Sequence, residues 1–192
     1  MNPRDFTGEI ERYHKRWLAN ALWVPGNGHH GIDLLSKTEY DGDAEYSDGF
    51  AIEFKSKIIK PGYPKLFAVN ADQVNDFPQE TQEMEFYWAF MFYTFAKEVK
   101  DVKKGEDLET LVTEREVWCI PWDWIRQFPV HNPKHSGPFR YVPKHRLPPP
   151  NEMTIFEEEK GRIYVPKNSN LETHLINRVF ILNSDSIREE TP

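Results

Sequence analysis

Two carboxylates and one ammonium lie inside stretches of sequence that are otherwise apolar. Asp33 belongs to the run GIDLLS of residues 31–36, and Glu53 and Lys55 belong to the run FAIEFKSKII of residues 50–59. Charged groups inside an apolar strand are costly unless they are paired or bind a metal ion. Because alternate residues of a strand share one face, Glu53 and Lys55 are expected to point the same way.

If the two strands pair as a hairpin, Asp33 faces Glu53 and Lys55, and the three side chains form an acidic pocket with a cation at its rim. A hard divalent ion such as Mg²⁺ binds one or two carboxylates together with phosphate oxygens of a substrate. The ion would neutralise charge on the phosphorus oxygens, and Lys55 would orient and activate the attacking water. The pattern therefore indicates metal-dependent hydrolysis at a phosphorus centre.

The tripeptide Glu-x-Lys carries little information by itself. It occurs again at residues 98–100 and 158–160, in charged stretches typical of a solvated surface. Only the copy at residues 53–55 follows an apolar run and has a Gly-x-Asp strand upstream. The alternative is an ordinary ion pair on a surface edge strand, which would contribute little to stability or function.

The order of residues 31–33 (GID) and 52–55 (IEFK) resembles the core motif of the PD-(D/E)XK nuclease superfamily. The similarity covers about residues 7–128. It includes a glutamate in a helix before the first strand, a glycine-rich approach, a glutamine in a short helix and two later buried strands, as in Holliday junction resolvases. The interval from Asp33 to Glu53 is longer than in typical resolvases and closer to that of some type II restriction endonucleases.

The resemblance implies a site in which Mg²⁺, or Mn²⁺ in its place, is held by Asp33, Glu53 and the main-chain carbonyl of Phe54. Lys55 and a helical glutamate would complete the catalytic group, and Gln73 would be an auxiliary residue. The helical glutamate is Glu9 or Glu11, which flank opposite sides of the apolar stripe of their helix, so only one can face the pocket. Glu9 is the favoured choice.

The function implied by this resemblance is that of a Mg²⁺-dependent DNA endonuclease with no organic cofactor. A homodimer is expected, because two cuts in a duplex usually require two sites. A type II restriction endonuclease is favoured, since base-specific readout needs elements beyond the core. A Holliday junction resolvase or DNA-repair nuclease is the alternative, and a non-catalytic nucleic-acid or protein interaction module on the same fold is the alternative from another class.

The net charge of −7 excludes a uniformly basic protein that binds nucleic acid without specificity. Seven acids and one lysine lie between residues 33 and 53, whereas residues 12–32, 54–71 and 126–150 carry cations and no acid. Cations in such stretches could hold the phosphates of DNA around an acidic pocket. The expected DNA contacts are Lys57, Lys60, Lys65, Arg140, Lys144 and Arg146.

The expected fold is α/β (α+β), with a central mixed sheet flanked by helices, a core like that of restriction endonucleases and a C-terminal elaboration. Apolar periodicity predicts a helix over about 7–22. It also predicts a buried strand over 86–96, for which a helix is the rival interpretation. The remaining expectations are strands at 31–36, 50–59 and 117–121, an acidic hairpin tip at 39–49, helical turns at 71–77, a charged connection at 97–116 and a helix at 122–128.

Three segments are expected along the chain. Residues 1–128 form the nuclease-like core, 129–150 a proline-rich basic connection, and 151–192 a hairpin and a terminal element packed on the core. The single cysteine, Cys119, excludes a disulfide within the chain and indicates a reducing compartment. No stretch has the length and hydrophobicity of a signal peptide or membrane span, so the expected location is the cytoplasm.

Overall fold

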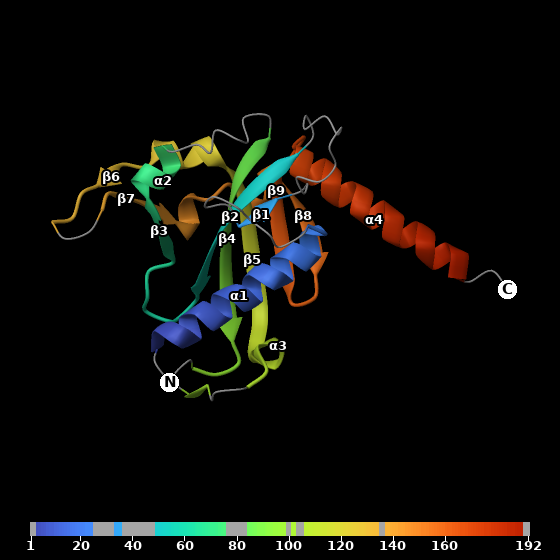
Figure 1. The fold of residues 1–192 in the computed structure, drawn as a ribbon, viewed down its shortest axis with the longest axis horizontal. Coiled ribbons are helices and arrows are strands. Elements are labelled where there is room, and N and C mark those ends of the chain that lie inside the picture. Colours follow the sequence, from blue (N-terminus) through green and yellow to red (C-terminus); the bar gives the residue numbers. More distant parts are fainter. Residues whose placement is uncertain are drawn as a thin grey trace.

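The computed structural model describes residues 3–24, 33–35, 49–75, 84–98, 101–102, 106–134 and 137–189. It is a mixed α/β structure with a mixed central sheet flanked by helices, which confirms the α/β class and the mixed sheet of the expected fold, whereas the likeness of its core to restriction endonucleases stays a prediction (Figure 1). Within these ranges no helix is both long enough and apolar enough to cross a membrane. The predicted acidic tip, apart from Gly49, and the glycine-rich approach at 25–31 lie outside the described residues.

The central sheet has six strands in the order β1–β2–β4–β5–β9–β8. β2 pairs with β4 and β5 pairs with β9 in parallel, whereas the other neighbours are antiparallel. The sheet is therefore mixed, as the sequence predicts. The strands are β1 (Leu34–Leu35), β2 (Phe50–Ile58), β4 (Glu85–Phe95), β5 (Val112–Pro121), β8 (Met153–Glu158) and β9 (Gly161–Pro166).

One face of this sheet is covered by α1 (Pro3–Leu22) and by the first turns of α4 (Asn170–Glu189). The helix predicted over 7–22 is thus confirmed. Leu18 and Leu22 of α1 and Leu171 of α4 are fully buried in one cluster with residues of β2, β4, β5 and β9. Beyond its first turns α4 extends away from the body of the molecule (Figure 1).

The opposite face is covered by a second, three-stranded antiparallel sheet in the order β3–β7–β6. Its strands are β3 (Leu66–Asn70), β7 (Phe139–Pro143) and β6 (Val130–His131). The helix α2 (Ala71–Asn75) and the 3₁₀ helix η4 (Trp122–Gln127) pack on the same side. Residues 129–150 are therefore more than an extended connection, because β7 pairs with β3 along its whole length.

β4 lies at the centre of the molecule with both of its faces buried. Trp88 and Phe90 point toward the second sheet, whereas Ala89 and Met91 point toward α1. Aromatic side chains fit such a pleated, doubly covered strand, and this burial explains why the run at 86–96 forms a strand rather than a helix. Trp118 of β5 is also buried, at 5% exposure.

The predicted charged connection at 97–116 differs from the structure. It contains the short helix α3 (Leu108–Leu111), and β5 begins at Val112, five residues before the expected strand. Arg115 consequently lies inside β5 and is fully buried. The alternation of Thr, Glu and Arg before the apolar run resembles a solvated segment, so a buried cation was not expected there.

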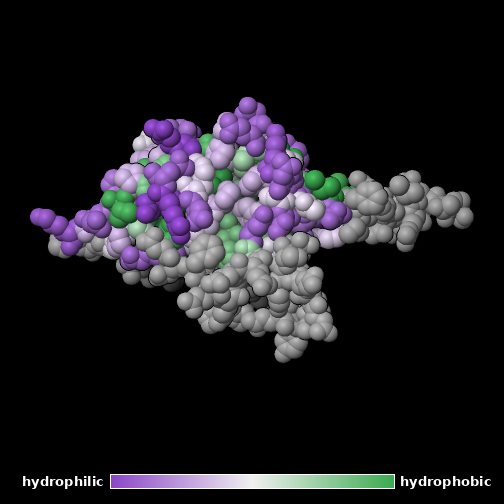
Figure 2. All heavy atoms as spheres, turned by 90° about the horizontal axis from the view of Figure 1, so that it is seen from above, coloured by the Kyte–Doolittle hydropathy of each residue, from purple (hydrophilic) through white to green (hydrophobic). Residues whose placement is uncertain are grey.

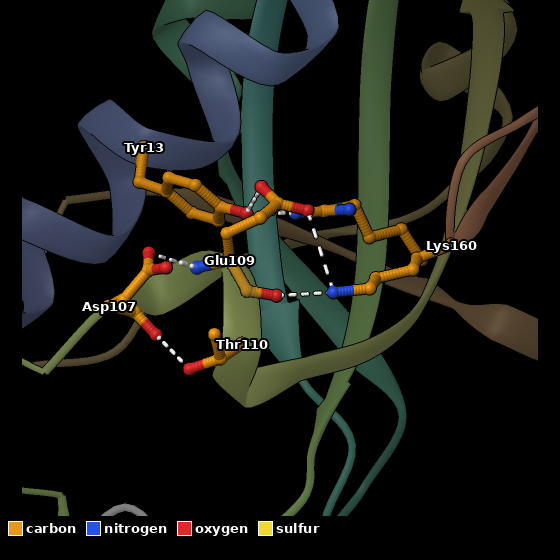
Figure 3. A network of polar contacts seen from close by, with 6 residues as sticks. Tyr13, Asp107, Glu109, Thr110 and Lys160 are labelled. Atoms are coloured by element: carbon orange, nitrogen blue, oxygen red, sulfur yellow. Dashed lines mark hydrogen bonds and ion pairs between the residues drawn. The ribbon is translucent and has the colours of Figure 1, made fainter.

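A polar network holds Arg115 at the junction of α1, α3 and the central sheet. Arg115 donates to the hydroxyl of Tyr13, and Tyr13 donates to the carboxylate of Glu109. Figure 3 shows Tyr13 and Lys160 reaching Glu109 from different elements. The Arg115 guanidinium also lies 4.7 Å from the centre of the Trp17 ring. These contacts engage Nη2 and the face of the guanidinium, whereas Nε and Nη1 have no hydrogen-bond partner among the described residues.

The described surface is mainly hydrophilic in the view from above, with small hydrophobic areas between polar residues (Figure 2). Single exposed hydrophobic side chains are normal on a protein surface. The predicted homodimer therefore stays a prediction. Among the residues whose exposure the structure describes, the large exposed hydrophobic ones are Trp23, Tyr63, Val130, Tyr141, Ile155, Ile176 and Val179.

Candidate active site

The candidate site lies where the short strand β1 begins beside β2. Leu34 pairs with Ile52 in an antiparallel register, as the hairpin prediction requires. The Asp33 N–H donates to the carbonyl of Ile52 at 3.0 Å, and Oδ2 of Asp33 accepts the N–H of Phe54 at 2.8 Å. The Asp33 side chain thus continues the strand pairing beyond β1, which fixes its carboxylate against β2.

Glu53 points to the face of the sheet that carries α2. Ile52 and Phe54 pack beneath α1, and Ala51 packs on the opposite face, so the alternation of the strand places Glu53 with Ala51. Glu53 is only 6% exposed. Its Oε1 accepts a hydrogen bond of 2.8 Å from Nε2 of Gln73 in α2. The predicted auxiliary glutamine is therefore in direct contact with the predicted metal ligand.

Lys55 lies on the same face as Glu53, as its spacing predicts. Its ammonium donates to Oε1 of Glu53 and lies 5.9 Å from the centre of the Trp88 ring. The Lys55 side chain keeps about a third of its surface exposed. The ammonium is therefore close to the buried carboxylate and still accessible from solvent.

The electrostatic environment of Glu53 disfavours an uncompensated negative charge. Burial raises the pKa of Glu53 above its ordinary value, and the negative charge of Asp33 raises it further. The ammonium of Lys55 and the hydrogen bond from Gln73 act in the opposite direction. The two carboxylates thus interact through a partly desolvated region, where a bound cation would stabilise both.

Asp33 has a second partner that the sequence did not assign to the site. The ammonium of Lys15 in α1 forms an ion pair with Oδ1 of Asp33. The basic group of Arg12, Lys15 and Arg16 is visible in the sequence, but which member meets Asp33 depends on how α1 crosses the sheet. Asp33 therefore lies between α1 and the central sheet. Its carboxylate contacts Lys15 of α1 and the N–H of Phe54 in β2.

Glu9 is exposed on α1 and lies six residues before Lys15, about 9 Å along the helix axis. It lines a surface hollow of about 260 Å³ together with Arg12, Lys15 and Arg16. Glu11 is exposed as well. The described contact from α1 to Asp33 is made by Lys15, and a catalytic role for Glu9 stays a prediction.

Two of the lysines that are expected to contact DNA have hydrogen-bond or ion-pair partners within the chain. Lys57 donates to the carbonyl of Leu66 at 2.8 Å and so ties β2 to β3. Lys144 forms an ion pair with Glu116, and its ammonium lies 5.1 Å from the Trp118 ring centre. Both side chains are half-buried, so their first role in this structure is to join the second sheet to the central one.

Arg140 also acts within the chain, because its Nη1 donates to the carbonyl of Arg126 at 3.1 Å near the end of η4. Lys60, Lys65 and Arg146 are exposed. These three cations have the accessibility that a phosphate contact requires. All six assignments to DNA stay predictions.

Comparison of the chain with protein-family models, curated proteins and solved structures finds no match. In the part of the chain that the structure describes, no three His, Cys, Asp or Glu side chains form a group that could hold a metal ion. The candidate donor set is accordingly the carboxylates of Asp33 and Glu53 with one backbone carbonyl. Any functional assignment therefore depends on the geometry of these few residues.

Proposed function

We propose that this chain is a Mg²⁺-dependent endonuclease of the PD-(D/E)XK type that hydrolyses phosphodiester bonds in DNA. The observation that carries the proposal is the convergence of Asp33, Glu53, Lys55 and Gln73 at one edge of a mixed sheet. These residues come from three separate elements, and each was singled out by the sequence motif. An ordinary surface ion pair does not explain a glutamate that is 6% exposed and influenced by a second carboxylate.

The residues present fit a hard divalent cation. Asp33 and Glu53 offer carboxylate oxygens, the ligands that Mg²⁺ and Mn²⁺ accept together with phosphate oxygens. The N–H and C=O of a strand residue point to the same neighbour, and the N–H of Phe54 points to Asp33. The Phe54 carbonyl is therefore directed toward the same side as the carboxylate. When bound, the metal would stabilise negative charge on the phosphorus oxygens and activate a water molecule.

The protein's own side chains have distinct tasks in this proposal. The ammonium of Lys55 carries three N–H donors, and its contact with Glu53 uses one, so donors remain for the attacking water or a phosphate oxygen. Gln73 fixes the orientation of the Glu53 carboxylate. The exposed cations Lys60, Lys65 and Arg146 would hold the sugar-phosphate backbone through salt-dependent contacts.

Within this class we favour a type II restriction endonuclease, because the long interval between Asp33 and Glu53 and the C-terminal third offer elements for base readout. A Holliday junction resolvase or repair nuclease is the alternative. One observation favours the rival from another class, a non-catalytic interaction module: each carboxylate already has an ammonium partner, Lys15 or Lys55. A cluster neutralised in this way could be purely structural.

The test is incubation of the full chain with plasmid, phage DNA and four-way junctions in Mg²⁺, Mn²⁺ or EDTA. We expect cleavage only with a divalent metal. Asp33→Asn, Glu53→Gln and Lys55→Met should each lower the rate at least about 100-fold, since each removes a group that acts in the transition state. Glu159→Gln and Lys167→Met are matched controls, since both change exposed residues outside the site.

Undiminished cutting by a folded variant at any of the three positions would overturn the site assignment. Discrete plasmid fragments would identify a restriction enzyme, and symmetric nicks near the crossover would identify a resolvase. Binding of DNA without cleavage under any metal condition would support the non-catalytic module instead.

A further inference from the structure

The ion pair between Lys15 and Asp33 occupies the carboxylate on which the proposed metal site depends. Oδ2 of Asp33 is engaged by the N–H of Phe54, and Oδ1 is engaged by the ammonium of Lys15. The backbone bond fixes the direction of the carboxylate, whereas the ammonium belongs to a side chain. A divalent cation that approaches Asp33 therefore meets a positive charge already in contact with its ligand.

The Lys15 side chain can move away from Asp33. Its side chain is 29% exposed, and its ammonium ends a flexible four-carbon stem that can swing into solvent. The surrounding surface of α1 carries Arg12 and Arg16, which line the same hollow as Lys15. Lys55 differs, because its partner Glu53 is the more buried carboxylate and because it packs over Trp88.

We infer that Lys15 is a positioning residue that holds Asp33 while no metal is bound and competes with the divalent cation for this carboxylate. The inference rests on the proposed function, because it takes Asp33 to be a metal ligand. It goes beyond that function in assigning a residue that sets the metal affinity of the site. Removal of the Lys15 charge should make metal binding tighter, whereas removal of an ordinary structural ion pair should only lower stability.

The experiment measures Mn²⁺ binding to the full chain without nucleic acid, from the loss of the free-ion signal in electron paramagnetic resonance. We expect Lys15→Gln to bind Mn²⁺ about 10-fold more tightly than the wild type, and Lys15→Arg to bind like the wild type. Arg16→Gln is the matched control. It removes the same charge from an exposed neighbour, where solvent screening should limit the change to less than about 3-fold.

When Asp33→Asn is already present, the additional change Lys15→Gln should no longer alter the affinity for Mn²⁺. Urea unfolding checks that every variant is folded. Equal affinities of Lys15→Gln and Arg16→Gln, or weaker binding by Lys15→Gln, would overturn the inference and leave the proposed function standing. Absence of Mn²⁺ binding in both the wild type and Lys15→Gln would overturn the inference together with the metal site.

Discussion

The stability of the fold should decrease as the pH is lowered from 7 to 5, because His14 of α1 folds in its neutral form. His14 is fully buried, and neither ring nitrogen has a hydrogen-bond partner among the described residues. Burial, and secondarily the charge of Arg115, lowers the pKa of His14 from 6.5 to about 3. The rings of Tyr93 and Tyr13 pack against it, with centres 4.2 Å and 5.2 Å away.

The direction of the effect follows from where each state binds the proton. Below pH 6.5 the unfolded chain protonates this histidine, whereas the folded protein does so only near pH 3. The stabilising contribution is therefore complete above pH 6.5 and is lost as the pH falls toward 3. The slope approaches about 1.4 kcal/mol per pH unit, which gives a loss of about 2 kcal/mol between pH 7 and pH 5.

The assay is urea unfolding at pH 7, 6 and 5, followed by tryptophan fluorescence. His14→Phe keeps an aromatic ring in the site and removes the titration. Because all other groups titrate in both proteins, the difference between the two stability profiles isolates His14. The free energy of unfolding of His14→Phe minus that of the wild type should increase by about 2 kcal/mol as the pH is lowered from 7 to 5, because only the wild type loses stability through this histidine.

His145→Asn is the control, because His145 is an exposed histidine in the 3₁₀ helix η5 (Lys144–Arg146). This variant should keep the pH profile of the wild type. A difference between wild type and His14→Phe that does not change with pH would refute the argument, since it would mean that the folded protein accepts the proton as readily as the unfolded chain.

Two further predictions concern packing around the central sheet. Gly161→Ala should lower the free energy of unfolding by about 1–3 kcal/mol, because its methyl group would lie 2.9 Å from the Trp17 ring; Gly137→Ala, with no described atom within 4 Å, should change it little. Equal urea midpoints for the two variants would contradict this. Trp122→Phe should cost about 1–2 kcal/mol, because it leaves the buried carbonyl of Val74 without the 3.0 Å hydrogen bond from Nε1. An unchanged thermal midpoint would show that the bond contributes nothing.

The parts of the site that could be predicted from the sequence are those set by the period of a strand. Glu53 and Lys55 share a face because they are two residues apart, and β2 forms over 50–58 because four of its five even positions are apolar. The proximity of Asp33 follows from the hairpin register. Local patterning was sufficient here because all three residues belong to two neighbouring strands.

The residues that were missed depend on contacts between distant elements. Lys15 reaches Asp33 only because of the angle at which α1 crosses the sheet, which no local pattern fixes. Arg115 has the neighbours of a surface residue, and its burial depends on Tyr13 and Glu109 from other elements. The pairing of β7 with β3 could likewise not be predicted from the sequence, since the prolines around β7 indicate an irregular segment.

The helices α1 and α4 together cover one face of the central sheet, although they lie far apart in the sequence, and this affects the order in which the protein can form. His174 of α4 contacts the carbonyl of Leu22, 152 residues away, and Arg178 donates to the carbonyl of Ala21. β9 pairs with β5, and the segment of sequence between these two strands contains β6 and β7, which complete the second sheet. Contacts of such long range slow folding, because long loops must close before the contacts form. Until β9 has left the ribosome, the edge of β5 to which it binds stays unpaired, and the chain is exposed to aggregation.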